Sequence, residues 1–294
     1  MMCMKYIYIV NRFNLKDRSE TMIERLKNVS DKLGRDYEII VNSSVEEAIN
    51  LKERLKESEA IVTAIGGDGS INHILNAIAN TRNVLSFIPV GTGNDFYKAN
   101  LEDLEDGIHT VDIAKINDQY FINLVCFGID ADIGNDDGFV HNSFIPESLR
   151  YNAGVVYHFL TYKPRKIKVE FNDQVIEKDF TTVVVGNAKY YGNGYRVSPN
   201  GNITDGKLEL LMCDKLNKIK MATTILSMKD SSHLKNPAIK IYECDHVVIS
   251  SDIPIRANVD GEVQENKRFE IAILPKQVKL EFNREFINQF LDIK

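Results

Sequence analysis

The chain has 294 residues, of which 36 are lysine or arginine and 42 are aspartate or glutamate, so its formal net charge is −6. A hydrophobic fraction of 44%, with 14 phenylalanines and 12 tyrosines, is enough for a large core and excludes intrinsic disorder, collagen and coiled coils. An acidic chain lacks the clustered lysine and arginine that attract a polyphosphate backbone, so we expect no nucleic-acid partner.

The cysteines and the longest apolar runs indicate the cellular environment. Cys3, Cys126, Cys213 and Cys244 form no Cys-x-x-Cys pair, which predicts neither a disulfide framework nor a zinc site. The apolar stretch at residues 6–10 is too short for the core of a signal peptide, and no run approaches the ~18 apolar residues of a membrane span. We therefore expect a cytoplasmic protein.

In the first third of the chain, short apolar runs alternate with helical periods, which is typical of a parallel sheet with crossover helices. Strands are expected over residues 6–10, 37–41, 61–65 and 84–90. The first helix is expected over residues 22–33 and ends at Gly34, which supplies a left-handed stop. Ser44 and Glu47 form a capping box for the second helix, and the third follows Ser70.

After about residue 111 the pattern changes to short strands, which we expect to pair mostly antiparallel. Asn172-Asp173, for example, is a two-residue hairpin turn between alternating runs. The expected strands are residues 120–127, 166–171, 175–180, 182–185, 208–212, 246–250, 255–259 and 269–274. Helices are expected only over residues 146–162 and 215–228, and again at the end of the chain, over residues 284–291.

These patterns predict the fold class and the domain boundaries. Residues 1–118 are expected to form an α/β N-terminal domain with a doubly wound sheet. Residues 119–276 are expected to form a β-sandwich-like C-terminal domain, and the tail, residues 277–294, to pack back on the first domain.

The sharpest motif is Gly66-Gly67-Asp68-Gly69-Ser70, at the junction of a strand and a helix. Glycines let backbone N–H groups approach an anion closely, and a helix N-terminus adds about half a positive charge. The motif is neither a P-loop nor the Gly-x-Gly-x-x-Gly fingerprint. It nevertheless predicts a loop that holds phosphate.

Asp68 is an unusual residue for such a loop, because phosphate repels a carboxylate unless a divalent cation or ordered water lies between them. Asp68 therefore indicates a nucleotide bound with Mg²⁺. The alternative is a helix cap, in which Asp68 accepts hydrogen bonds from the N–H groups of Ser70 or Ile71.

A second glycine turn follows the next strand: Gly91-Thr92-Gly93-Asn94-Asp95-Phe96. Both turns are expected at the carboxyl edge of the same sheet, where open α/β sheets bind ligands. Thr92 and Asn94 offer neutral donors to phosphate oxygens, while Asp95 caps the next helix or orients a donor. The alternative is an ordinary glycine-rich turn.

Together the two turns resemble the catalytic domain of the diacylglycerol kinase, sphingosine kinase and ceramide kinase superfamily, in its bacterial soluble lipid kinase branch. The family's Gly-Gly-Asp-Gly-Thr loop is matched by residues 66–70, and its Gly-Thr-x-Asn-Asp-Phe loop by residues 91–96. Segments similar to its second-domain signatures are residues 186–187, 191–194, 198–200, 205–208 and 258–262. The resemblance covers nearly the whole chain and implies an N-terminal fold of the NAD kinase and diacylglycerol kinase type.

The resemblance implies a kinase that uses ATP and Mg²⁺ to phosphorylate a lipid hydroxyl, with diacylglycerol as the expected acceptor. Asp260 would be the general base, although Val-Asp-Gly between strands is by itself an everyday hairpin turn. Asp68 would be a second catalytic residue, connected to the metal region through water. A structural Mg²⁺ would be held by the Asp205 carboxylate and the main-chain carbonyls of Asn202 and Lys207.

The resemblance also implies a set of nucleotide-binding residues. They are Asn11, Asn42, Gly66, Gly67, Asp68, Gly69, Ser70, Gly91, Thr92, Gly93, Asn94 and Glu262. The acceptor would be a lipid at the membrane surface, which the enzyme would visit transiently. The sequence leaves the oligomeric state open, a homodimer included.

Two departures from the family pattern keep other functions open. The family's Asn-Pro-x-Ser-Gly-Lys segment is replaced here by Asn-Arg-Phe-Asn-Leu-Lys at residues 11–16, and His73 stands where the family has glutamate. One alternative is therefore a nucleotide-binding regulatory protein without activity. A further alternative rests on the glycine loop itself, which soluble kinases of NAD and of sugar phosphates share, with Ser70 at its end as in the bacterial phosphofructokinase loop. Against it, the chain lacks the arginine clusters that a sugar-phosphate site needs, and its second half is sandwich-like.

The basic segment at residues 163–168 has two interpretations. Ile167, Val169 and Phe171 alternate with charged residues, which favours the entrance of a strand whose charged side faces water. The alternative is contact between its lysines and anionic lipid head groups.

Overall fold

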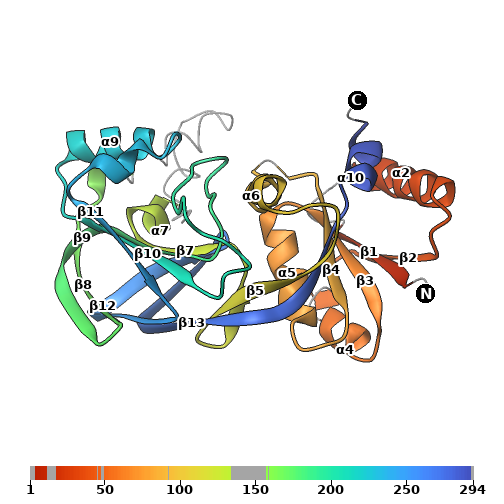
Figure 1. Cartoon of the computed structure of the whole chain (residues 1–294), viewed down its shortest axis with the longest axis horizontal. Helices are drawn as coiled ribbons and strands as arrows, with labels where there is room; N and C mark the ends of the chain where they lie inside the picture. Colours follow the sequence, from red (N-terminus) through yellow and green to blue (C-terminus); the bar gives the residue numbers. More distant parts are fainter. Residues whose placement is uncertain are drawn as a thin grey trace. The chain divides into compact units, whose positions relative to one another are not determined.

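The computed structural model describes residues 4–11, 18–44, 46–47, 50–91, 93–133, 157 and 159–292. The chain divides into two compact units (Figure 1). Unit 1 comprises Met1–Ile113, Ile203–Asp205 and Leu274–Lys294, and unit 2 comprises Ala114–Asn202 and Gly206–Ile273. Thr92, residues 12–16 and most of the helix expected over residues 146–162 lie outside the described residues.

Unit 1 is built on a parallel sheet with the strand order β13-β4-β3-β1-β2. Its strands are β1 (Lys5–Asn11), β2 (Tyr37–Asn42), β3 (Ala60–Gly66), β4 (Val84–Pro89) and the end of β13 (Glu262–Phe282). The first four confirm the predicted strands. Every residue of β3 is buried, and because successive side chains point to opposite faces, both faces of the sheet are covered.

Helices follow the strands of unit 1 as the helical periods predicted. They are α2 (Arg18–Lys32), α4 (Leu51–Leu55), α5 (Asp68–Ile78), α6 (Asp95–Asp103) and α10 (Arg284–Leu291). Gly34 has a φ of 63°, the left-handed stop expected after α2. Only half of the expected capping box is present, since Glu47 N donates to Ser44 Oγ (3.2 Å), whereas the Glu47 carboxylate accepts from Ser43 N (2.6 Å) and not from Ser44 N. It does not cap α4, whose N-cap residue is Asn50.

The C-terminal helix α10 packs into the core of unit 1. The Arg35 guanidinium lies 4.0 Å from the centre of the Tyr6 ring and 3.8 Å from that of Phe286, so it is held between the two rings. Phe286 also stacks on Tyr8 at 5.9 Å. Asn283 caps α10 by accepting a hydrogen bond from Phe286 N (2.9 Å).

Unit 2 is an antiparallel, β-sandwich-like unit, as predicted. Its strands are the end of β5 (Gly107–Ile116), β6 (Gln119–Phe121), β7 (Leu124–Gly128), β8 (Arg165–Phe171), β9 (Gln174–Gly186), β10 (Leu208–Asp214), β11 (Ile239–Cys244), β12 (His246–Val259) and most of β13. All of them contribute to one buried cluster, in which Phe127 packs edge-on against Phe269. β5 and β13 each pass from one unit into the other.

Several strands differ from the prediction. Residues 120–127 were expected as one strand, but Ile122 and Asn123 separate β6 from β7. Conversely, the runs at 246–250 and 255–259 form one strand, β12, whose register with β13 shifts between Ser250 and Ile255. The Asn172-Asp173 turn is confirmed, with φ values of 45° and 58°.

In the part of unit 2 that the structure describes, α9 (Lys218–Ser227) confirms the helix predicted over residues 215–228. The helix α7 (Ile129–Ile133) and the short 3₁₀ helix η1 (Ser232–Lys235) were not predicted. Ile167 and Val169 are buried, while Lys166 and Lys168 pair with glutamates, so residues 163–168 are a strand entrance as favoured.

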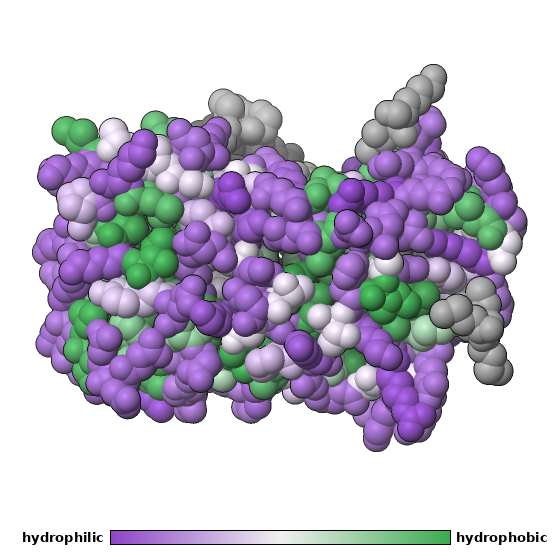
Figure 2. Space-filling view, in the orientation of Figure 1, coloured by the Kyte–Doolittle hydropathy of each residue, from purple (hydrophilic) through white to green (hydrophobic). Residues whose placement is uncertain are grey.

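Three of the four cysteines are described by the structure. Cys126, Cys213 and Cys244 are buried free thiols, and Cys3 lies outside the described residues. In the part of the chain that the structure describes, no helix is both long and apolar enough to span a membrane. The face drawn in Figure 2 is mostly hydrophilic, with hydrophobic side chains gathered in a few patches.

The packing of α10 predicts a large effect of Phe286→Ala. The variant removes a buried aromatic ring that stacks on Tyr8 and covers Arg35, so we expect the free energy of unfolding to fall by about 3–5 kcal/mol. Urea titration measures this loss. Asn288→Ala, at an exposed position of the same helix, is the control and should change it by less than about 1 kcal/mol. Equal stability of the two variants would contradict a core role for α10.

Candidate active site

The first glycine loop joins β3 to α5. Gly67 is the N-cap residue, and its carbonyl oxygen accepts hydrogen bonds from Ser70 N (3.0 Å) and Ile71 N (3.2 Å). A Cβ atom on Gly66 would overlap the Ser70 hydroxyl, so this packing requires glycine. A Cβ atom on Gly69 would meet nothing within 4 Å. Because the first N–H groups of a helix lack intrahelical partners, this open space suits an anion.

The second glycine loop follows β4 and lies directly against the first. A Cβ atom on Gly91 would be 2.5 Å from Gly67 Cα and 2.9 Å from Gly67 N, so only glycine allows the two backbones to come this close. Val90 N donates to the carbonyl oxygen of Gly66 (3.0 Å), which continues the pairing of β3 and β4 into the loops. The structure thus brings both predicted loops together at one edge of the sheet.

Asp68 connects the two loops through its carboxylate. Its Oδ2 accepts a hydrogen bond from Asp95 N (3.0 Å) and its Oδ1 accepts one from Phe96 N (2.9 Å), so it caps α6. The sequence analysis considered Asp68 as a cap of α5, but Asp68 caps α6. The N–H groups of Ser70 and Ile71, at the start of α5, donate to the carbonyl oxygen of Gly67 instead. Burial raises the pKa of Asp68, and the two backbone hydrogen bonds partly oppose that shift.

Asn94 builds the second loop from inside. It has a left-handed φ of 52°, and its Oδ1 accepts a hydrogen bond from Gly91 N (3.0 Å). Its amide nitrogen donates to the carbonyl oxygens of Pro89 (3.2 Å) and Gly91 (2.9 Å). Both amide hydrogens of Asn94 are therefore used within the loop, so its side chain supports the loop.

Asn11 and Asn42 meet at the carboxyl ends of β1 and β2. They are directly opposite in the parallel register, both are buried, and Asn42 Nδ2 donates to Asn11 Oδ1 (3.0 Å). Because these strands lie beside β3 in the sheet, the pair is at the same edge as the glycine loops.

A groove of about 470 Å³ opens beside the second glycine loop. It is lined by Arg18, Thr21, Met22, Arg25, Pro89, Val90, Gly91, Phe290 and Leu291. Arg18 donates to the carbonyl oxygen of Val90 (3.3 Å) and Arg25 to that of Phe290 (3.1 Å). The sequence motifs did not indicate Arg18 and Arg25, because the groove that they line is completed by α10, which lies far from them along the chain.

In unit 2, Asp260 occupies the two-residue turn between β12 and β13. Its φ is 48° and that of Gly261 is 101°, as in the hairpin turn anticipated from sequence. Its side chain, however, is only 5% exposed. The carboxylate accepts hydrogen bonds from the N–H groups of Ile122 (2.9 Å), Asn123 (3.0 Å) and Leu124 (2.9 Å). The break between β6 and β7 supplies these donors.

Three of the second-domain signatures surround this turn. Asn258 accepts a hydrogen bond from Gly261 N (2.9 Å) and donates one to the hydroxyl of Tyr191 (2.9 Å). Asn187 donates from Nδ2 to the carbonyl oxygen of Ile122 (2.8 Å), which supports the break between β6 and β7. Glu262 is exposed at the start of β13, where Gln119 donates to its Oε2 at 3.4 Å.

The signature at residues 205–208 forms the turn before β10. Asp205 and Lys207 are exposed, Asn202 is half-buried, and Gly206 has a φ of 73° that only glycine adopts readily. Among the residues that the structure describes, no group of three or more histidines, cysteines, aspartates or glutamates is arranged to hold a metal ion. A metal at this turn would therefore depend on one carboxylate, main-chain oxygens and water.

Glu209 is a functional candidate that the motifs did not indicate. Its carboxylate accepts hydrogen bonds from Ser198 Oγ (2.9 Å) and Asn200 N (3.1 Å), and so holds the 198–200 signature against β10. Burial raises its pKa. In the sequence, Glu209 could have been noticed only as a single acidic residue inside the apolar run 208–212.

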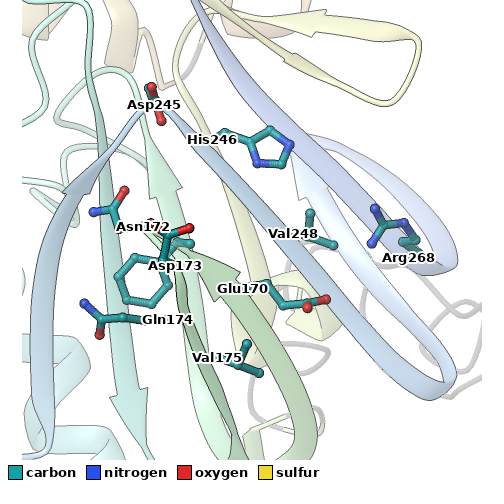
Figure 3. A pocket seen from close by; sticks show the side chains of 10 residues that line it. Glu170, Asn172, Asp173, Gln174, Val175, Asp245, His246, Val248 and Arg268 are labelled. Carbon is teal, nitrogen blue, oxygen red and sulfur yellow. The ribbon is translucent and has the colours of Figure 1, made fainter.

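A second hollow, of about 630 Å³, lies in unit 2 at the hairpin between β8 and β9 (Figure 3). Its labelled side chains include Glu170, Asp173, His246 and Arg268. His246 and Arg268 are each 3.2 Å from the Glu270 carboxylate. None of the predicted site residues that the structure describes lines this hollow.

An N-terminal α/β domain with two glycine loops at its carboxyl edge, followed by a β-sandwich-like domain, defines the class of protein. Residues 5–119 match the diacylglycerol kinase catalytic domain, and residues 123–282 match the YegS C-terminal NAD kinase beta sandwich-like domain. The chain therefore belongs to the diacylglycerol kinase family, as its motifs indicated.

Individual relatives agree with this assignment. Diacylglycerol kinases from Staphylococcus haemolyticus and Bacillus subtilis are 27% and 25% identical over 227 and 228 residues. The matches cover 73% and 71% of this chain, and 68% and 72% of those proteins. A crystal structure of a diacylglycerol kinase from Bacillus anthracis has a TM-score of 0.69 at 20% identity, covering 96% of this chain and 98% of that one, and shows the shared fold.

Because Asp68 joins the two loops and has a raised pKa, we expect Asp68→Asn to lower the stability of the protein by an amount that depends on pH. An amide has only one oxygen to offer the two N–H groups of α6, so we expect a loss of about 1–3 kcal/mol in the free energy of unfolding. The pKa of Asp68 is raised in the folded state. Its contribution to the free energy of unfolding is therefore full at low pH and falls as the pH rises through that pKa.

The difference between wild type and Asp68→Asn should therefore narrow as the pH rises from about 4 to 7. Urea titrations at several pH values measure it. Asp36→Asn, at an exposed position of unit 1, is the control and should change the free energy of unfolding by less than about 0.5 kcal/mol. A constant difference for Asp68→Asn would contradict the assigned shift.

Proposed function

We propose that the chain is an ATP- and Mg²⁺-dependent kinase that transfers the γ-phosphoryl group of ATP to the hydroxyl group of diacylglycerol. The observation that carries the proposal is the pair of glycine loops that Asp68 joins into one surface, in a chain that also holds the buried carboxylate of Asp260. The acceptor is supported by the family and by relatives that are named diacylglycerol kinases.

The residues of unit 1 bind the nucleotide in this proposal. The phosphates occupy the open space beside Gly69, where the helix dipole and the N–H groups at the start of α5 attract an anion. Asn11 and Asn42 line the nucleotide further along the same edge. In this proposal Asp68 is a positioning residue and not a catalytic one, since its carboxylate is bonded to backbone N–H groups of α6.

The residues at the turn before β10 fit Mg²⁺ in their chemistry. Asp205 offers an exposed carboxylate, and Asn202 and Lys207 offer main-chain carbonyl oxygens, which are the hard ligands that this ion takes. Mg²⁺ keeps several waters, so a single carboxylate is compatible with binding. When bound, the ion would be structural and would hold this turn in place.

Asp260 is the general base in this proposal. It accepts the proton of the acceptor hydroxyl as that oxygen forms its bond to the γ-phosphorus and ADP leaves. Three backbone hydrogen bonds fix the orientation of the carboxylate. Asn258, bonded to Tyr191 and to Gly261, holds the turn that carries it.

Asp260→Asn tests this proposal. We expect the rate of phosphatidate formation from labelled ATP and diacylglycerol to fall at least about 100-fold, because the amide cannot act as the base. Calorimetric binding of Mg-ATP should be unchanged, since the proposed phosphate-binding loops belong to unit 1. Asp173→Asn is a matched control, because Asp173 is an exposed carboxylate in another two-residue hairpin turn of unit 2.

Each other outcome has a definite meaning. Undiminished turnover by Asp260→Asn would remove Asp260 from the mechanism. Wild-type protein that binds Mg-ATP but phosphorylates no acceptor would favour a regulatory protein, and transfer to NAD or fructose 6-phosphate in place of diacylglycerol would favour a kinase of that acceptor.

A further inference from the structure

Helix α9 of unit 2 exposes apolar side chains on its outward face. Ile219 is 79% exposed and Leu226 is 64% exposed. They are seven residues apart, so they lie on the same face two turns apart. The opposite face, with Met221 and Thr224, is buried against the unit.

Exposed apolar residues concentrate around this helix. Leu160, 64% exposed, belongs to a segment bonded to α9, because Lys218 Nζ donates to the carbonyl oxygens of Phe159 (2.5 Å) and Tyr162 (2.6 Å). Figure 2 shows hydrophobic atoms at the upper left edge of the molecule, over α9. Isolated exposed apolar residues are normal on a protein surface, but a cluster of them marks an interaction site.

Helix α9 and the residues beside it carry a net positive charge, whereas the whole chain is negatively charged. Residues 214–230 contain four lysines and two aspartates, Asp214 and Asp230, and so carry a net positive charge in a chain of net charge −6. Lys220 is exposed on the helix next to Ile219. Lys215 is exposed just before the helix, where it is paired with Asp179, and Lys229 is exposed just after it. The apolar face is therefore bordered by basic side chains at both ends.

We propose that the outward face of α9, with Leu160, docks onto the surface of an anionic phospholipid bilayer. The inference rests on the proposed function, whose acceptor is a membrane lipid. An amphipathic helix at an interface buries aliphatic side chains at the level of the head groups, while its lysines attract anionic lipids. The strongest anchors of protein interfaces are tryptophan, tyrosine and arginine, whereas this face offers Ile219, Leu226 and lysine.

Co-sedimentation with vesicles tests the surface directly. The probes are vesicles of phosphatidylcholine alone and of phosphatidylcholine with phosphatidylglycerol. We expect the wild type to bind the anionic vesicles, and the double variant Ile219→Glu, Leu226→Glu to bind them at least about tenfold more weakly. The matched control is Val175→Glu, Ile253→Glu, which places the same charge at two exposed apolar positions outside α9 and should bind like wild type.

Vesicle binding is read without any phosphoryl transfer, so its result is independent of the proposed function. Activity on a dispersed, short-chain diacylglycerol should be the same in the α9 variant and the wild type, because α9 acts only in docking. If no protein transfers phosphate, the proposed function fails while the binding result stands.

Equal vesicle binding by the α9 variant and the wild type would overturn the inference. So would a wild-type dimer, seen by sedimentation equilibrium, that becomes monomeric in the α9 variant without any change in vesicle binding. That result would assign the face to contact between two copies of the chain.

Discussion

The close contact between the two glycine loops is the constraint on which the candidate nucleotide site depends. Gly67 and Gly91 approach so closely that a single added Cβ atom would lie 2.5 Å from a backbone carbon. Asp68 then joins the loops by capping α6 from the start of α5. The ends of β3 and β4 therefore carry one rigid surface, and the N-terminus of α5 opens onto the space beside Gly69.

Unit 2 uses a buried aspartate in a similar way. The break between β6 and β7 frees three backbone N–H groups, and the Asp260 carboxylate accepts hydrogen bonds from all three. Leaving such donors buried without a partner would cost about 1–3 kcal/mol each, so the broken strand and the hairpin turn stabilise one another. In both units an aspartate of a sequence motif holds separate segments of the backbone together through its carboxylate.

Local patterns were enough to predict much of the fold. The apolar runs of β1 to β4 and the Asn172-Asp173 turn follow from neighbouring residues, whereas the role of Asp260 was expected only from the resemblance to the family. Long-range effects were not visible. The break at Ile122 is supported by a residue 138 positions later, and the end of β13 returns to pair with β4. The partner of Asp68 was missed because a motif does not reveal which helix lies across from it.

The binding of Mg-ATP to Gly69→Ala tests most directly whether the paired loops hold the phosphates. The added methyl group meets no protein atom within 4 Å, so the free energy of unfolding should stay the same or rise by up to about 1 kcal/mol. The methyl group would stand where we expect the phosphates, so calorimetric affinity for Mg-ATP should fall at least about tenfold. A stable variant that binds Mg-ATP as tightly as the wild type would contradict the account.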